Sequence, residues 1–259
     1  MKISPYQNIA ETYEAIRPSY PEELMTDLAI HVCLSPDSQI LEIGAGTGKA
    51  TQQLLSFGCQ VDALELEPAM AEILAKKLPL PNLHIIVSPF ESWIPQRNNY
   101  SCICCAQSFH WLDAYIKFQK CWDLLSPSGS LALIWYDPIP SDTDAAQDAA
   151  NFVYQKYFHM QPTAVTIPIT DRTQELRSTA YFQLCFQKQY DVILQNTPIQ
   201  ALLALHSTPA FSELFSQLSQ AQQSAFHEEY CDAIQLHGGY VNTKMRYSLY
   251  LLKPVHEVS

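Results

Sequence analysis

Three glycines at alternate positions are the most chemically informative residues of the sequence. Gly44, Gly46 and Gly48 follow an apolar run and precede a stretch of helix-forming residues. Glycine has no Cβ, so its backbone can take a positive φ and lie close to a bulky ligand at a helix N-terminus. Glu42 places a carboxylate at the end of the apolar run. We therefore expect a strand, a tight turn and a helix start, with a nucleotide-like ligand on the turn.

The spacing separates this turn from two well-known phosphate-binding motifs. A P-loop, G-x-x-x-x-G-K-S/T, would need Gly at position 43 and Ser or Thr at position 50, where this chain has Ile43 and Ala50. A dinucleotide fingerprint needs a third glycine three residues after the second, where the chain has Lys49. A glycine turn that only packs a helix onto a strand remains as an alternative.

The remaining pattern, an acid followed by Gly-x-Gly-x-Gly, resembles motif I of the class I S-adenosylmethionine-dependent methyltransferases. That resemblance implies S-adenosyl-L-methionine as the cofactor and S-adenosyl-L-homocysteine as the product. It also implies cofactor binding by Glu42, Gly44, Ala45, Gly46 and Gly48. An acid suits this cofactor, because it carries cationic sulfonium and ammonium groups and no phosphate.

A second acid, Glu65, ends the next predicted strand, over residues 60–65, about 20 residues after the glycine turn. In nucleotide-binding folds built from two such strands, this position holds a carboxylate that can accept hydrogen bonds from both ribose hydroxyls. The run Glu65-Leu66-Glu67-Pro68-Ala69-Met70 resembles the second motif of the same family, which implies that Leu66 and Met70 lie near the cofactor. The alternative is that Glu65 is a solvated acid that precedes a helix.

Two further predicted strands, residues 83–87 and 100–106, also end in polar and aromatic residues. In the family, the turn after the first of them contacts the adenine ring, which implies Phe90 and Glu91 as cofactor-binding residues. Ser88 and Pro89 depart from the glycine and acid that are often found there.

The turn after the second strand reads Gln107-Ser108-Phe109-His110-Trp111. With Ala106 it resembles a signature of methyltransferases related to trans-aconitate methyltransferase. The resemblance implies Gln107 as a cofactor contact, His110 as a base or an orienting group for the substrate, and Trp111 as a pocket wall. A carboxylate acceptor would need no base. In the alternative interpretation, His110 caps the next helix and Trp111 belongs to the core.

The N-terminal region predicts two helices, residues 8–17 and 22–32, on either side of Arg17-Pro18-Ser19-Tyr20-Pro21. Small-molecule methyltransferases that this chain resembles carry a similar Arg-Pro-x-Tyr-Pro sequence and fold it over the cofactor as a lid. This implies substrate or lid positions for Tyr13, Arg17 and Tyr20, with Arg17 available to pair with a carboxylate. The alternative for Arg17 is a solvated charge at a helix end.

These elements and the resemblance predict one α/β methyltransferase domain over residues 1–259. We expect a doubly wound, Rossmann-like sheet of seven mostly parallel strands with an antiparallel last strand, and a helical cap formed by the N-terminus and an insertion. The parts are lid helices (1–36), a cofactor-binding core (37–136), the insertion or cap (137–180), and C-terminal strands and helix (181–259). Further strands are predicted over 131–136, 182–193 and 244–253, and further helices over 50–57, 113–125, 145–158, 197–205 and 210–236.

Composition restricts the partners. The 259 residues carry a net charge of -11 and no basic run, so a nucleic acid would be repelled and a small-molecule substrate is favoured. No apolar stretch approaches the length of a membrane span or a signal h-region, so we expect no membrane partner and a cytoplasmic location. Of the eight cysteines, Cys102, Cys104 and Cys105 lie within one predicted strand, where Cys behaves as a small hydrophobe, and no Cys/His cluster has ligand spacing, so we expect no metal site. The sequence leaves the oligomeric state open.

The activity expected from these residues is methyl transfer to a small acceptor, with an oxygen of a carboxylic acid favoured over nitrogen or carbon. Two alternatives stay open: a regulatory protein that binds S-adenosylmethionine without turnover, and a nicotinamide oxidoreductase.

Overall fold

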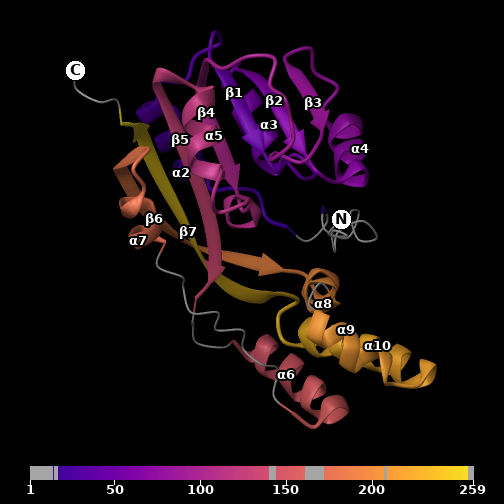
Figure 1. The fold of residues 1–259 in the computed structure, drawn as a ribbon. Helices are drawn as coiled ribbons and strands as arrows, with labels where there is room; N and C mark the ends of the chain where they lie inside the picture. Colours follow the sequence, from indigo (N-terminus) through magenta and orange to yellow (C-terminus); the bar gives the residue numbers. More distant parts are fainter. Residues whose placement is uncertain (1–13, 15–16, 140–143, 161–171, 207–208, 256–259) are drawn as a thin grey trace.

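The computed structural model describes residue 14 and residues 17–139, 144–160, 172–206 and 209–255. The predicted helix over residues 8–17 lies mostly outside this part, as does Tyr13. Within the described part, one seven-stranded sheet has the order β3-β2-β1-β4-β5-β7-β6 (Figure 1). The strands are β1 (Gln39–Ile43), β2 (Gln60–Glu65), β3 (Leu83–Val87), β4 (Tyr100–Ala106), β5 (Leu125–Pro138), β6 (Phe182–Asn196) and β7 (Val241–Pro254).

The helices connect and flank these strands. They are α2 (Glu22–Val32), α3 (Lys49–Leu55), α4 (Pro68–Lys77), α5 (Lys117–Leu124), α6 (Ala145–Phe158), α7 (Thr173–Ser178), α8 (Pro198–His206), α9 (Pro209–Ser216) and α10 (Gln220–Leu236). A short 3-10 helix, η1, covers Phe109–Trp111. None of the helices in the described ranges is both long enough and apolar enough to cross a membrane.

Strand direction confirms the predicted fold class. β1 to β5 pair in parallel, whereas β7 runs antiparallel to both β5 and β6. In the register of β1 and β2, Ile43 is opposite Leu64. The turn after β1 therefore lies beside the end of β2, where Glu65 is found.

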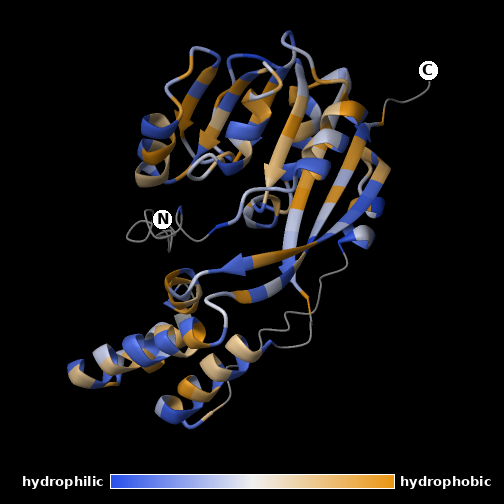
Figure 2. Cartoon of the chain, turned by 180° about the vertical axis from the view of Figure 1, so that it is seen from behind, coloured by the Kyte–Doolittle hydropathy of each residue, from blue (hydrophilic) through white to orange (hydrophobic). Residues whose placement is uncertain are grey.

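The sheet separates two hydrophobic clusters. One lies between the sheet and α2, α3 and α4, and includes Leu24, Leu54 and Leu74. The other lies on the opposite face, and includes Cys121 of α5 and Leu176 of α7. Hydrophobic residues are concentrated in the central strands, whereas the C-terminal end of β6 is hydrophilic (Figure 2).

A third cluster joins α6, α8, α9 and α10 into a separate group, which we call the helical layer. It lies beyond the ends of the long strands β6 and β7 (Figure 1). The cap was predicted to combine the N-terminus with the insertion, and most of its first helix lies outside the described residues. α2 buries Leu24 and Leu28 against the sheet, and α6 of the insertion packs mainly against C-terminal helices.

Two predicted helices have different limits for local reasons. α5 begins at Lys117 rather than residue 113, because the Asp113 carboxylate accepts the Tyr115 backbone N–H at 2.8 Å and competes with a helical turn. The predicted helix over 210–236 is two helices. Ser219 has an extended backbone and forms a capping box with Gln222, so it starts α10 anew.

Residues 125–130 form the irregular first part of β5. Leu125 pairs with Tyr100 and Ser130 pairs with Cys102, so the intervening residues form an irregularity in the ladder. A Cβ at Gly129 would lie 2.8 Å from the Tyr100 carbonyl oxygen, so this close approach requires glycine.

Candidate functional site

The glycine turn between β1 and α3 has the left-handed backbone expected from its sequence. Gly44, Gly46 and Gly48 have φ values of 73°, 58° and 85°. A Cβ on Gly44 would lie 2.5 Å from the Ser108 Cβ, and one on Gly48 would lie 2.3 Å from the Leu74 Cδ1. A Cβ on Gly46 would meet no atom within 4 Å. The outer two glycines therefore permit close packing, while Gly46 borders open space.

Glu65 closes the other side of this turn. Its Oε2 accepts the Gly46 N–H at 2.6 Å, and its Oε1 accepts the Glu67 N–H at 2.8 Å. Only 7% of Glu65 is exposed. Burial raises the pKa of its carboxyl, while the two backbone donors partly oppose that rise. Hydrogen bonds from two backbone N–H groups thus hold the Glu65 carboxylate against the turn.

Glu42 lies behind the turn and is 1% exposed. Its Oε2 has no hydrogen-bond partner among the described residues. Burial, together with the nearby Glu65 charge, raises its pKa to about 8, so the carboxyl is mostly protonated at neutral pH. A buried oxygen without a hydrogen-bond partner is suited to accept a hydrogen bond from a donor group of a ligand.

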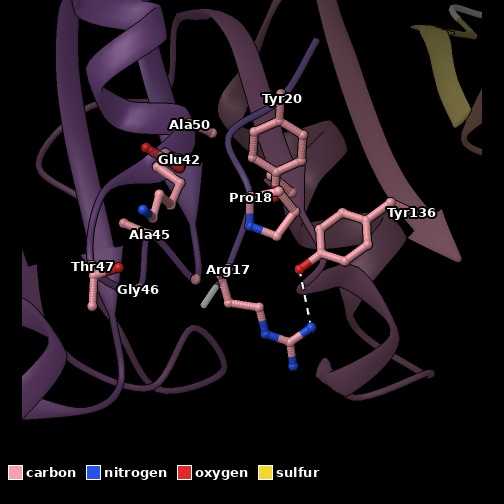
Figure 3. Close-up of a pocket in the computed structure, with 12 residues that line it drawn as sticks. Arg17, Pro18, Tyr20, Glu42, Ala45, Gly46, Thr47, Ala50 and Tyr136 are labelled. Carbon is pink, nitrogen blue, oxygen red and sulfur yellow. Dashed lines mark hydrogen bonds between the residues drawn. The ribbon is translucent and has the colours of Figure 1, made fainter. Parts of the chain in front are cut away.

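A cavity of about 30 Å³ adjoins the turn. Figure 3 shows Glu42 and the turn on one side and the N-terminal segment with Tyr136 on the other. The lining residues are Arg17, Pro18, Tyr20, Glu42, Gly44, Ala45, Gly46, Thr47, Lys49, Ala50, Ala106 and Tyr136. The cavity is much smaller than the roughly 300 Å³ at which ligand pockets begin.

Hydrogen bonds fasten the N-terminal segment, residues 17–20, to the sheet and to α3. Arg17 Nη1 donates to the Tyr136 hydroxyl at 3.0 Å. The Gln53 amide of α3 accepts the Tyr20 N–H at 3.1 Å and donates to the Tyr20 carbonyl at 2.8 Å. Tyr20 is only 8% exposed and packs its ring near those of Tyr136 and Tyr247. Tyr20 is therefore a buried wall of the cavity, and Arg17 lies at its edge.

The residues predicted near the adenine differ in accessibility. Leu66 is 49% exposed at the end of β2, whereas Met70 is 3% exposed in α4. Phe90 is also 3% exposed, and its ring belongs to the core on the α5 face. The Phe90 ring is therefore too buried in this structure to stack on an adenine. Glu91 accepts the Asp113 N–H at 3.1 Å and so ties two loops together.

Gln107 leaves β4 with a positive φ of 61°, which is uncommon for a residue other than glycine. Its side-chain nitrogen donates to the Tyr136 carbonyl at 2.7 Å. Ser108 follows at 8% exposure and donates its hydroxyl to the Ile43 carbonyl. The Gln107 amide is thus engaged with β5 rather than directed at the turn.

His110 and Trp111 occupy η1, just past the carboxyl end of β4. The indole N–H of Trp135 donates to the His110 Nδ1 at 3.2 Å. Trp111 is 69% exposed, and its ring centre is 5.0 Å from that of His110. Neither residue caps a helix through its side chain in this structure.

Several residues that the sequence did not single out surround these positions. Trp135, Tyr136 and Asp137 end the buried part of β5, and this strand end was predicted without assigning them roles. Arg172 pairs with Asp137 at 3.2 Å and lies 4.6 Å from the centre of the Trp135 ring. Nothing in the local sequence indicated Arg172, because it reaches β5 from the start of α7.

A second hollow, of about 240 Å³, lies elsewhere on the sheet and includes Asp62, Trp93, Arg97 and Tyr100 in its lining. None of the predicted site residues borders it. Tyr100 begins β4, and ligands of open α/β sheets bind at the opposite, carboxyl ends of the strands. The described residues also contain no group of three or more His, Cys, Asp or Glu placed to hold a metal ion.

Known proteins share the central part of this chain. Residues 40–129 match a family described as a methyltransferase domain. An uncharacterized methyltransferase-like protein of Schizosaccharomyces pombe is 29% identical over 161 residues, 58% of this chain and 62% of that protein. The malonyl-(acyl-carrier protein) O-methyltransferase of Priestia megaterium is 29% identical over 132 residues, 49% of this chain and 47% of that protein. The chain thus spans less than two thirds of either relative.

A solved structure shares the whole fold. It is a SAM-dependent methyltransferase from Thiobacillus denitrificans in complex with S-adenosyl-L-homocysteine, with 14% identity and a TM-score of 0.56 over 98% of this chain and 100% of that one. At this identity the likeness concerns the fold alone. The matched segment, the fold and the turn make this chain similar to the class I S-adenosylmethionine-dependent methyltransferases. S-adenosyl-L-methionine is the cofactor of that class.

The residues at the turn fit such a cofactor. The open space beside Gly46 leaves room against the backbone, and the unsatisfied Glu42 oxygen borders the cavity. Both Glu65 oxygens retain acceptor capacity beyond the single backbone donor that each one binds.

Proposed function

We propose that this protein transfers the methyl group of S-adenosylmethionine to an oxygen of a small carboxylic acid. One observation carries the cofactor part: Glu65 and the glycine turn meet beside a cavity that the buried, unsatisfied Glu42 carboxyl borders. A ligand with hydroxyl and cationic groups needs carboxylates such as these as partners. An apolar ligand does not.

In this proposal Glu65 accepts hydrogen bonds from the ribose hydroxyls, and Leu66 and Met70 lie on the adenine side. Glu42 and the turn residues face the methionine end, where Arg17 is close enough to the cavity to pair with a carboxylate. When bound, the cofactor supplies a methyl group that is already activated as a sulfonium.

The size of the cavity has a consequence for binding. A space of about 30 Å³ holds roughly one water, so it cannot contain the cofactor as it stands. We expect the Arg17–Tyr136 hydrogen bond to open or shift, because these two residues form the wall opposite the turn. The Gln53 clamp on Tyr20 would keep the rest of the segment in place.

The chain's main contribution to catalysis would be position. Holding an acceptor oxygen in line with the transferable methyl group can supply about 7–11 kcal/mol of the barrier. The residues past the ends of β4 and β5, including His110, would hold the acceptor there. Exclusion of water by the N-terminal segment would protect the activated methyl group.

Four considerations favour a small carboxylic acid. The net charge of -11 opposes binding of nucleic acid. The run from Ala106 to Trp111 resembles that of trans-aconitate methyltransferases, and a relative's name is that of an O-methyltransferase. A carboxylate is also nucleophilic without loss of a proton.

The test is to incubate the full chain with S-adenosylmethionine and a panel of organic acids that includes trans-aconitate and malonate. We expect S-adenosylhomocysteine and a methyl ester in equal amounts, both measured by mass spectrometry. Tight binding of S-adenosylmethionine without product from any acid would favour a regulatory protein. Equilibrium dialysis that showed NAD binding and no S-adenosylmethionine binding would favour an oxidoreductase and overturn the proposal.

A further inference from the structure

The contact between His110 and Trp135 defines which ring nitrogen of His110 carries a proton. Trp135 is 1% exposed, and its indole is held by edge contacts with Phe109 and Tyr250 at centroid distances of 6.4 and 5.7 Å. Its N–H points to the His110 Nδ1 at 3.2 Å. The donor is therefore built into the sheet core and cannot easily turn away.

An indole nitrogen only donates hydrogen bonds, so the His110 Nδ1 must accept through its lone pair. In a neutral imidazole the single proton then resides on Nε2. A doubly protonated ring would place two N–H groups against each other across the 3.2 Å contact. The contact therefore favours the neutral ring and one tautomer of it.

Charges on the neighbouring elements act in the same direction. Partial burial lowers the pKa of His110, and the positive charges of Arg172 before α7 and Lys117 in α5 lower it further. Asp137 of β5 opposes this effect but is itself paired with Arg172. Lys117 in turn is paired with Glu175 at 2.6 Å. His110 is accordingly neutral at physiological pH.

We propose that His110 acts as a hydrogen-bond donor through Nε2 and selects an acceptor whose methylated group is already an anionic oxygen, a carboxylate. This inference rests on the proposed function and assigns the substrate class to a particular atom. The Nε2 nitrogen has no lone pair for a proton, and no other hydrogen bond reaches the ring from the described residues. His110 in this tautomer therefore offers no base to a hydroxyl or amine acceptor.

The transfer step balances without a base. One carboxylate oxygen accepts the Nε2–H bond, and the other oxygen forms a bond to the methyl carbon. The carbon–sulfur bond breaks, and its electron pair goes to sulfur. An anionic acid and a cationic sulfonium thus become a neutral ester and a neutral thioether, and no proton is released.

The tautomer can be measured without any turnover. We expect a long-range ¹H–¹⁵N correlation spectrum of the ¹⁵N-labelled full chain with S-adenosylhomocysteine to show His110 protonated at Nε2 alone. His237 supplies an internal control, since its Nδ1 lies 2.7 Å from the Ala233 carbonyl and must donate to it, which gives the opposite tautomer. An Nδ1-protonated or fully protonated His110 at neutral pH would overturn the proposal.

Two variants separate donation from proton abstraction. In H110Q the amide nitrogen can take the place of Nε2 as a donor, whereas H110A removes the donor. With trans-aconitate or malonate as the acceptor and saturating cofactor, we expect H110Q to stay within about tenfold of the unchanged chain. H110A should lose roughly ten- to hundredfold, as for a hydrogen bond to a charged group. H237Q is the control that should change nothing.

The pH profile provides the second readout. Turnover of the unchanged chain should be flat above the lowered pKa of His110, because a carboxylate acceptor is ionised well below neutral pH. A rising limb that follows a histidine pKa, with equal losses in H110Q and H110A, would identify a base and refute the donor role. Failure of the proposed function is distinct, because it would appear as absent S-adenosylhomocysteine binding by calorimetry, whatever the His110 tautomer.

Discussion

The glycine turn and the helical layer keep their shapes by different means. At the turn, backbone conformation and close approach decide the structure, since Cβ atoms on Gly44 or Gly48 would lie within 2.5 Å of a neighbour. In the helical layer, the packing of large aromatic side chains decides the structure. Phe226 contacts rings from α6 and α9 at centroid distances of 5.2 to 5.9 Å. Function near the turn should therefore depend on single atoms, and stability of the layer on side-chain size.

The largest expected effect is in the helical layer. Phe226 is fully buried, so Phe226→Ala should cost about 3–5 kcal/mol of unfolding free energy through lost burial and a cavity. Urea unfolding would measure this loss, with Phe152→Ala, at a 71% exposed position, as the control. Calorimetry should still show S-adenosylhomocysteine binding by the folded fraction. An equal loss of ligand affinity would break the distinction between the two regions.

The next prediction compares two glycines of the turn. Gly44→Ala should destabilise the chain by about 2–4 kcal/mol, because left-handed strain is joined by a clash with Ser108. Gly46→Ala should cost only about 1–2 kcal/mol, since its Cβ enters open space. Urea unfolding without ligand measures both variants. Equal losses of unfolding free energy in the two variants would mean that the clash with Ser108 adds no cost at Gly44.

Glu42 predicts a pH dependence in the protein without cofactor. Its folded pKa of about 8 lies above the ordinary 4.5, so its stabilising contribution is complete below about pH 4.5 and is lost as the pH rises toward 8. Gln has no proton to lose. The unfolding free energy of Glu42→Gln should therefore rise relative to that of the unchanged chain across this window, by up to about 4 kcal/mol at its upper end. Unfolding curves at several pH values test this, and a constant difference would contradict it.

The last of these predictions concerns cofactor binding. Glu65→Ala should weaken S-adenosylhomocysteine binding by about 1.5–3 kcal/mol if charge-assisted bonds to the ribose are lost. Calorimetry would measure the dissociation constant, with Glu72→Ala at an exposed position of α4 as the matched control. An unchanged constant would remove Glu65 from the proposed site.

The sequence predicted the cofactor side of the fold well because that side depends on local patterns. Strands over 60–65, 83–87 and 100–106 have their predicted limits, and the three glycines adopt positive φ. Apolar runs between turn residues are sufficient to locate buried parallel strands. The roles of the predicted site residues in binding remain predictions.

The acceptor side was less predictable because its contacts join distant segments. Arg172 and Trp135 meet although they are far apart in the sequence, and their contact follows from where α7 packs on the sheet. The Trp135–His110 bond depends on the pairing of β4 with β5, which no local pattern specifies. The break at Ser219 did have a local signal, the capping box with Gln222, which the helical periodicity around it concealed.

The left-handed conformation of Gln107 has one further consequence. Its backbone N–H donates to Ile134 at 2.8 Å and its side chain to Tyr136 at 2.7 Å, so the residue adds an extra rung between β4 and β5. A positive φ at a residue other than glycine costs about 1–3 kcal/mol. This conformational free energy is part of the free energy of folding and is not added when a ligand binds. The corner that carries Ser108 and His110 is thereby preorganised, and a β-branched residue at position 107 would be poorly tolerated.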